Sequence, residues 1–297
     1  MISTLQELIA PLGERDFFEL LRNRTLSFRR SSGGSRFEGL LDWNTLRGLI
    51  ESGVIPPRKY RLTHRTHKVP ELFYIEKGKV NAANLASLIA QGVSVVTDPI
   101  QSHIPGLKTL CADITARTGE VTRADAVMTT GAGGAITLHF DLVDIIVLQL
   151  EGSKRWRIYG PPVTYPIKGM PAQTPPETAP LFDETLKPGD LLFMPGGYWH
   201  HCDNGPGRSF HVALMLNAPT GWHAVEALLR QLPEDEMFRV PFTRLADAEK
   251  AAHEAALKAR LIERIGQMSM AEMATAAGQA VVSNATKAGR SSADAEA

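Results

Sequence analysis

The sequence predicts a β-rich α+β fold, in which a barrel of strands lies between an N-terminal mixed region and C-terminal helices. An apolar segment of strand type, 145–150, and an alternating one, 154–159, flank a turn-like Glu-Gly-Ser, and residues 210–217 are apolar on both faces. After Gly221 the composition shifts to helix formers. At 297 residues and 43% hydrophobic, the chain can bury a sizeable core. We therefore expect four regions: 1–80, 81–219, 220–282 and a disordered tail, 283–297.

The N-terminal region is predicted to be largely helical. Apolar residues between positions 2 and 21 are spaced for two short amphipathic helices, broken near Pro11 and Gly13. Asp42 is placed to cap a further helix over residues 43–52, because its carboxylate can accept hydrogen bonds from the first turn. Residues 31–35, rich in Ser and Gly, form a flexible loop between these elements.

The central region is predicted to alternate helices and strands. Helices are expected over 84–90 and 107–118, and a strand over 93–96. Residues 130–134 are a glycine-rich loop, and no helix follows it, so it is not a phosphate-binding fingerprint. Residues 145–150 and 154–159 are expected to pair as a hairpin, and the proline-rich segment 161–180 to cross the barrel mouth in an extended conformation.

The overall composition predicts a soluble cytoplasmic protein. The 32 basic and 32 acidic residues cancel, which excludes a global electrostatic attraction to nucleic acid or membranes. Cys111 and Cys202 are expected to be reduced thiols, since two distant cysteines make no disulfide framework. The sequence shows no signal peptide and no stretch long enough to span a bilayer.

Charge is nevertheless uneven along the chain. Residues 22–68 contain eleven Lys and Arg against three acids. This basic rim predicts an acidic partner, such as an acidic peptide, a carrier protein or ribosomal RNA. The alternative is a solvated surface that acidic parts of the fold balance.

Three residues form a candidate metal site. His139 and Asp141 are two apart in an extended stretch, so their side chains point to the same face. His200 follows the Pro-Gly-Gly bend at 195–197. Two histidines and one carboxylate can occupy one face of an octahedral ion, as in non-haem Fe(II) sites. The alternative for the first two residues is a polar pair on a solvated face.

Strand parity selects a fourth residue. Lys154, Trp156 and Ile158 share one face of their strand, so Lys154 faces inward if the other two are buried. A buried ammonium is costly without an anion, and the carboxylate of a bound small molecule would supply one. The alternative is that Lys154 lies at the exposed end of a turn.

These residues and their flanks carry a family resemblance. The segments His139–Asp141, Val147–Trp156, Leu186–Asp190 and Pro195–His200 resemble the JmjC-type 2-oxoglutarate oxygenases, and within them the ribosomal oxygenases. Residues 198–201 also resemble the asparaginyl hydroxylase of hypoxia signalling. The similarity covers roughly residues 80–217. It implies a double-stranded β-helix, the cupin or JmjC jelly roll.

The resemblance implies the chemistry as well. His139, Asp141 and His200 would bind Fe(II) and form the catalytic centre, and Lys154 would bind the distal carboxylate of 2-oxoglutarate. His200 matches the family's position, whereas His201 would point to the other face of the strand. With O₂ as the third reactant, such enzymes hydroxylate a C–H bond and release succinate and CO₂.

The sequence departs from the family pattern in two places. Where the family often has Tyr and Asn, this chain has Ala126, Val127 and Met128. The polar candidates for further cosubstrate contacts are then Thr130, beside Thr129, and Asn217. In the ribosomal oxygenases, a dimerising helical region and a winged-helix domain follow the barrel. Here we expect the helices only, and with them a possible homodimer.

Several functions stay open at this level. The first is hydroxylation of a protein or peptide side chain, with a small-metabolite hydroxylase and an N-methyl demethylase as variants of the same chemistry. The second is a metal cupin that performs no oxygenation, such as an isomerase. The third is a non-catalytic binding module.

Overall fold

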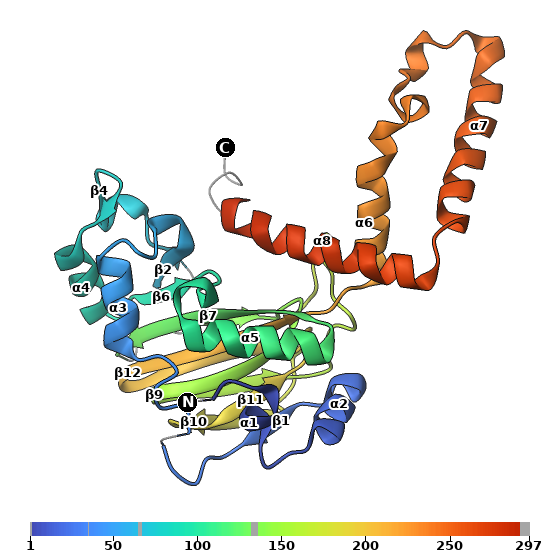
Figure 1. Ribbon diagram of the computed structural model, residues 1–297. Coiled ribbons are helices and arrows are strands. Elements are labelled where there is room, and N and C mark those ends of the chain that lie inside the picture. Colours follow the sequence, from blue (N-terminus) through green and yellow to red (C-terminus); the bar gives the residue numbers. More distant parts are fainter. Residues whose placement is uncertain (1, 35, 65–66, 132–135, 292–297) are drawn as a thin grey trace. The chain divides into compact units, whose positions relative to one another are not determined.

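The computed structural model describes residues 2–34, 36–64, 67–131 and 136–291 (Figure 1). Its backbone divides into two compact units. The first contains Met1–Asn217 and the second Ala218–Ala288. Each unit is described by itself.

The first unit is built on antiparallel strands. Ten of them form one connected sheet, in which the order β1-β11-β9-β12-β7-β6-β2-β3 is followed and β10 and β8 add to β9 and β12. The strands are β1 (Ser27–Arg29), β2 (Tyr60–His64), β3 (His67–Lys68), β6 (Ser94–Thr97), β7 (Val121–Thr130), β8 (Ile136–His139), β9 (Asp144–Tyr159), β10 (Phe182–Leu186), β11 (Leu191–Met194) and β12 (Trp199–Asn217). A separate ribbon pairs β4 (Ile75–Glu76) with β5 (Lys79–Val80).

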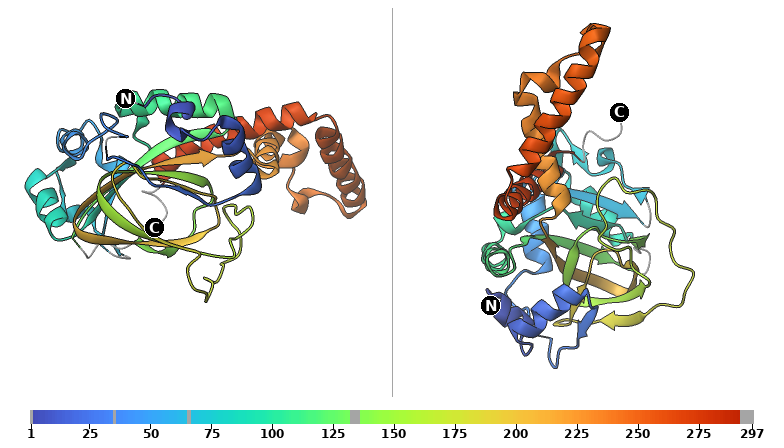
Figure 2. Two further views of the ribbon diagram at one scale, coloured as in Figure 1. Left: turned by 90° about the horizontal axis from the view of Figure 1, so that it is seen from below. Right: turned by 90° about the vertical axis from the view of Figure 1, so that its right-hand side faces the viewer.

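Two long strands fold this sheet into a barrel. Along β9, residues 145–148 pair with β11 and residues 154–158 pair with β10. Along β12, residues 208–217 pair with β7, while 200–202 pair with β8. Each long strand therefore belongs to a larger sheet at one end and a smaller sheet at the other. Figure 2, left, shows the strands curving around a common interior, as the predicted double-stranded β-helix requires.

The predicted hairpin within β9 is wrong. Residues 144–159 form one strand that pairs with β12 on both sides of Gly152. Gly152 has a φ of 60°, and a Cβ atom there would lie 1.7 Å from the Arg208 carbonyl oxygen. The glycine bends the strand from one sheet into the other, instead of reversing it, because β12 passes close against it.

Helices cover the outer face of the larger sheet. They are α1 (Leu5–Ile9), α2 (Glu14–Asn23), α3 (Trp43–Glu51), α4 (Ala82–Ala90) and α5 (Pro105–Thr118). The predicted break between the first two and the helices at 43, 84 and 107 are confirmed. Asp42 accepts a hydrogen bond from the Thr45 amide at 2.9 Å, so the predicted cap is confirmed as well.

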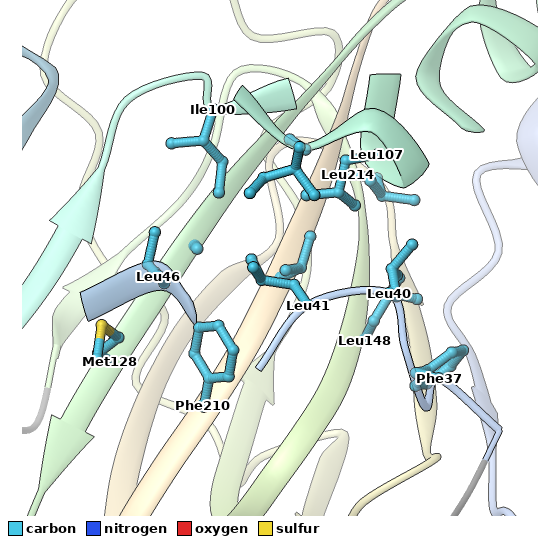
Figure 3. Packing of buried hydrophobic residues seen from close by; sticks show 14 of the residues in the cluster. Phe37, Leu40, Leu41, Leu46, Ile100, Leu107, Met128, Leu148, Phe210 and Leu214 are labelled. Carbon is cyan, nitrogen blue, oxygen red and sulfur yellow. The ribbon is translucent and has the colours of Figure 1, made fainter. Parts of the chain in front are cut away.

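Alternation along the strands separates two cores. Ile146 and Leu148 of β9 belong to the outer core, between the larger sheet and the helices. Figure 3 shows Leu107 of α5 beside Leu214 of β12, and Leu46 of α3 near Phe210. Ile145 and Val147 face the barrel interior and its smaller apolar cluster. The functional residues lie on this inner face.

The second unit contains α6 (Gly221–Gln231), α7 (Asp247–Gly266) and most of α8 (Met270–Ser291). The predicted helical region therefore forms. Helix α8 continues past residue 283, where the tail was predicted to begin. Residues 292–297 of that tail lie outside the described part. A hollow of about 270 Å³ is lined by Phe242, Leu245, Lys250, His253, Glu254 and Leu257. In the described part of the chain, every helix is too short or too polar to cross a bilayer.

Candidate active site

The three predicted metal ligands lie together at one end of the barrel. His139 ends β8, Asp141 lies two residues further along the chain, and His200 lies opposite His139 on β12. One ligand atom from each residue lies within 4.8 Å of the other two. The Asp141 Oδ2 and His200 Nε2 atoms are 3.6 Å apart, and the two imidazole rings are 4.3 Å apart between centroids.

His200 is held in one orientation. Its Nδ1 donates a hydrogen bond to the Tyr198 carbonyl oxygen at 3.0 Å, which turns Nε2 toward Asp141. The Trp156 indole stacks on the imidazole at 5.7 Å between centroids. Burial, together with the neighbouring His139, lowers the pKa of His200 to about 4. The ring is therefore neutral near pH 7, as a metal ligand must be.

The donor set fits a divalent transition metal. Two imidazole nitrogens and one carboxylate oxygen on one side of an ion are the donors of the facial triad used by non-haem Fe(II) sites. His201, the neighbour of His200, stacks on Tyr159 at 5.7 Å and contacts Arg157. The expectation that it points to the other face is confirmed.

Lys154 is buried, as its strand parity predicts. The side chain is 0% exposed, and its Nζ atom makes no hydrogen bond to any described residue. Burial lowers the pKa of this amine. The alternative of an exposed turn is wrong, because Gly152 and Ser153 lie within a continuous strand. An orphaned amine in the barrel interior indicates a site for an anion.

Other polar groups surround this amine. The Trp156 Nε1 and His211 Nδ1 atoms are buried and also make no hydrogen bond to a described residue. The Trp156 and His211 rings meet edge to face at 5.6 Å. Burial and the charge of Lys154 lower the pKa of His211, and burial raises the pKa of the Cys202 thiol to about 12. Neutral groups thus surround the lysine, and an entering carboxylate would find several N–H donors in one place.

Thr130 and Asn217, the weaker cosubstrate candidates, have other partners. The Thr130 hydroxyl donates to the Ile89 carbonyl oxygen. The Asn217 amide donates to the Val121 and Met215 carbonyl oxygens at 2.9 and 3.1 Å. Asn217 ends β12, whereas His200 lies near its start. Both side chains are occupied by the backbone, and neither belongs to the metal-ligand cluster.

The sequence reasoning missed Asp125. This residue lies on β7, opposite Ala213, on the face that turns away from the outer core. Its Oδ1 atom is buried and makes no hydrogen bond to a described residue, although the side chain is partly exposed. Burial raises the pKa of its carboxyl to about 7, and the charge of Asp141 contributes to the rise. The signal in the sequence that could have identified Asp125 was a single carboxylate between Ala124 and Ala126 in a buried strand.

The fold and the donor set define a jelly-roll barrel with a facial metal site. Residues 104–223 match the family model of the JmjC domain. This part of the chain is therefore similar to the JmjC domain, as its motifs predicted.

Curated relatives are similar over part of the chain. It is 26% identical to ribosomal oxygenase 1 of Rattus norvegicus over 231 residues, which are 72% of the chain and 37% of that protein. It is 29% identical to the bifunctional lysine-specific demethylase and histidyl-hydroxylase NO66 of Drosophila willistoni over 145 residues, 47% of the chain and 19% of that protein. The chain thus spans less than half the length of these relatives.

Solved structures show the same fold. The ribosomal oxygenase YcfD of Escherichia coli, in a complex with cobalt and 2-oxoglutarate, aligns with a TM-score of 0.59 and 18% identity, over 86% of this chain and 68% of that one. The chain thus shares its fold with this solved structure, and its sequence is similar to curated ribosomal oxygenases.

Proposed function

We propose that the protein is an Fe(II)- and 2-oxoglutarate-dependent oxygenase that hydroxylates a C–H bond on a protein or peptide side chain. In this proposal His139, Asp141 and His200 hold the metal, and Lys154 pairs with the distal carboxylate of 2-oxoglutarate. Bound Fe(II) would couple O₂ reduction to the oxidative decarboxylation of the cosubstrate. The curated relatives are named ribosomal oxygenases and a histidyl-hydroxylase, which supports a protein substrate.

The observation that carries the proposal is the orphaned amine of Lys154. A facial triad by itself is compatible with several metal enzymes. A fully buried lysine without an anion costs free energy in the empty protein, and a dicarboxylate whose other end reaches the metal would remove that cost. 2-Oxoglutarate has this chemistry, with a keto acid at one end and a carboxylate at the other.

In this proposal, each group of residues at the site has a separate role. The Tyr198 carbonyl keeps the proton of His200 on Nδ1, so that Nε2 is available to the metal. Lys154 fixes the far end of the cosubstrate. The apolar side chains of the inner core, among them Ile145, Val147 and Leu192, exclude water from the barrel interior.

Turnover of the cosubstrate tests the proposal directly. Protein loaded with Fe(II) is expected to convert 2-oxoglutarate to succinate in the presence of O₂. His139→Ala and Lys154→Ala should abolish this conversion. Lys187→Ala is a matched control, because Lys187 is exposed and its neighbour Leu186 pairs with Lys154. A wild-type protein that neither binds nor converts 2-oxoglutarate would contradict the oxygenase function.

The same assay separates the alternatives without oxygenation, and analysis of the other products separates the variants of the oxygenase. A non-redox metal cupin, such as an isomerase, would bind metal without consuming 2-oxoglutarate, and a binding module would bind a carboxylate without turnover. An N-methyl demethylase would release formaldehyde, and a small-metabolite hydroxylase would add oxygen to a free metabolite. The buried Lys154 beside an intact triad favours the oxygenase over the first two.

Asp125 supports a proposal about the substrate group. Its Oδ1 atom is buried and makes no hydrogen bond to a described residue, and the charge of Asp141 reaches it. We therefore propose that Asp125 accepts a hydrogen bond from an N–H group of the substrate side chain, such as an amide, an imidazole or a guanidinium. Mass spectrometry of peptides that present these side chains, before and after reaction, would detect the gain of one oxygen.

An acidic partner for the basic rim at 22–68 is a further proposal. Arg30, Arg47 and Arg61 form ion pairs within the chain. The side chains that could meet a partner are Arg22, Arg29, Arg58, Lys59 and Lys68. Binding of an acidic peptide that weakens when these residues are changed to alanine would support the partner. A cytoplasmic location stays a prediction.

A homodimer through the C-terminal helices is also proposed. Trp222, Val225 and Leu229 of α6 follow helical spacing, and each is at least 44% exposed. Such a row of apolar side chains is a common docking surface for a second copy. Sedimentation of the wild type and of Trp222→Glu would test it, since a dimer should dissociate when the apolar row receives a charge.

A further inference from the structure

A short turn before His200 connects several parts of the first unit. The Gly197 amide donates to the Asp141 carbonyl oxygen at 2.8 Å, and the Gly197 carbonyl accepts from the Val163 amide at 2.9 Å. The Gly196 amide donates to Asp144 Oδ1 at 2.7 Å. The turn thus contacts the chain around the metal ligands on one side and the proline-rich segment 161–180 on the other.

The turn has no room for a side chain. A Cβ atom on Gly197, whose φ is 90°, would lie 1.9 Å from the Val163 carbonyl oxygen. A Cβ atom on Gly196 would lie 3.0 Å from the Val143 carbonyl carbon. Because the backbones approach this closely, a shift of the turn must also move the residues on either side.

Arg24 connects this turn to the N-terminal helices. It follows α2 in a left-handed conformation with φ of 51°, and its guanidinium donates to the Gly196 carbonyl oxygen. The same guanidinium lies over the Tyr165 ring, 4.6 Å from its centroid. One side chain therefore holds both the turn and the proline-rich segment. The described structure gives no such contact for Arg22 of the same helix, which is exposed.

We propose that Arg24 is a positioning residue that fixes the Gly196–Gly197 turn and, through it, the orientation of the metal ligands. The turn leads directly to Tyr198, whose carbonyl oxygen accepts the His200 Nδ1 proton, and it binds the Asp141 carbonyl oxygen. The inference rests on the proposed metal centre. Loss of the Arg24 contact frees the turn, and with it both ligands lose their mutual orientation.

Co(II) is the probe for the metal arm of the test. Arg24→Ala is expected to weaken Co(II) binding about tenfold, the effect typical of losing an outer-shell contact, and to change the visible absorption of the bound ion. Arg22→Ala, the matched control, should bind Co(II) as the wild type does. Arg24→Lys keeps a donor for the Gly196 carbonyl and should restore most of the affinity, which also guards against a folding defect in Arg24→Ala.

Trypsin is the probe for the proline-rich arm. Lys168 is the only Lys or Arg in residues 161–180, so cleavage after it reports release of that segment. Arg24→Ala and Tyr165→Ala should both accelerate this cleavage, whereas only Arg24→Ala should change Co(II) binding.

Equal Co(II) affinity and spectrum in Arg24→Ala and Arg22→Ala would overturn the positioning role and leave the metal centre intact. A wild-type protein that does not bind Co(II) would instead refute the metal centre, and the positioning role with it.

Discussion

Replacement of Lys154 by methionine should make the ligand-free protein more stable than the wild type. The same change should reduce the stability that the protein gains when it binds 2-oxoglutarate. Methionine has a similar length and no charge, and the site is 0% exposed with no hydrogen-bond partner for Nζ among the described residues. Burial of an unpaired polar group costs on the order of 2 kcal/mol in proteins, and Lys154→Met removes that cost. The free energy of unfolding should rise by a similar amount.

The gain should depend on pH. Burial lowers the pKa of Lys154 below its ordinary value of 10.5, so the unfolded chain binds more protons than the folded one between these two values. Wild-type stability therefore rises with pH across this window. The advantage of the methionine variant is largest below the lowered pKa and falls, as the pH approaches 10.5, to the cost of burying the neutral amine.

Denaturant unfolding, with and without 2-oxoglutarate and a divalent metal, measures both effects. At a cosubstrate concentration of about 100 times Kd, the wild type should gain about 2.7 kcal/mol, and Lys154→Met should gain far less. Lys187→Met is the control, since Lys187 is exposed and should change neither value. A methionine variant that is less stable without ligand, yet responds fully to 2-oxoglutarate, would refute the assignment of Lys154.

Three further changes test other parts of the structure. Gly152→Ala should destabilise the barrel severely or prevent folding, because its Cβ would collide with the Arg208 carbonyl and its φ is 60°. Soluble yield and thermal unfolding report this effect. A stable variant would contradict the close passage of β12 at this bend. Asp125→Asn should raise stability above pH 7 by about 4 kcal/mol and lose that gain toward pH 4, because burial raises the carboxyl pKa to about 7 and ionisation there costs free energy. A pH series of unfolding measurements checks the sign. Asp42→Ala should cost about 1 kcal/mol through the lost cap and leave metal binding unchanged, as denaturant unfolding and Co(II) titration would show.

The sequence determined local features well. The cap at Asp42 and the break between the first two helices follow from residue chemistry within a few positions, which a single sequence shows directly. The parity of Lys154 also needed only its neighbours, because alternation along a strand is a local rule. The approach of His139, Asp141 and His200 is a contact between distant segments. Residue type and spacing made these residues candidates, and the family motifs supported grouping them.

Features that depend on distant chain segments were not visible. Glu151-Gly152-Ser153 has the composition of a turn, and only the passage of β12 across Gly152 shows that the strand continues. The occupied side chains of Thr130 and Asn217 depend likewise on carbonyls of α4 and β7. Asp125 was missed because one carboxylate in an apolar strand gives no periodic signal, and its isolation becomes evident only when the opposing residues are placed.

The bend at Gly152 also affects how the barrel opens. Since β9 and β12 each run through both sheets, the amide groups beside the outer core and those beside the metal site belong to the same hydrogen-bonded ladders. Local opening of one sheet would have to break hydrogen bonds of a strand that also forms part of the other sheet. Amide hydrogens at Leu148 and Ile158 of β9 are therefore expected to exchange with solvent at the rate of one shared opening event. The metal-binding end should then be as resistant to local opening as the main core.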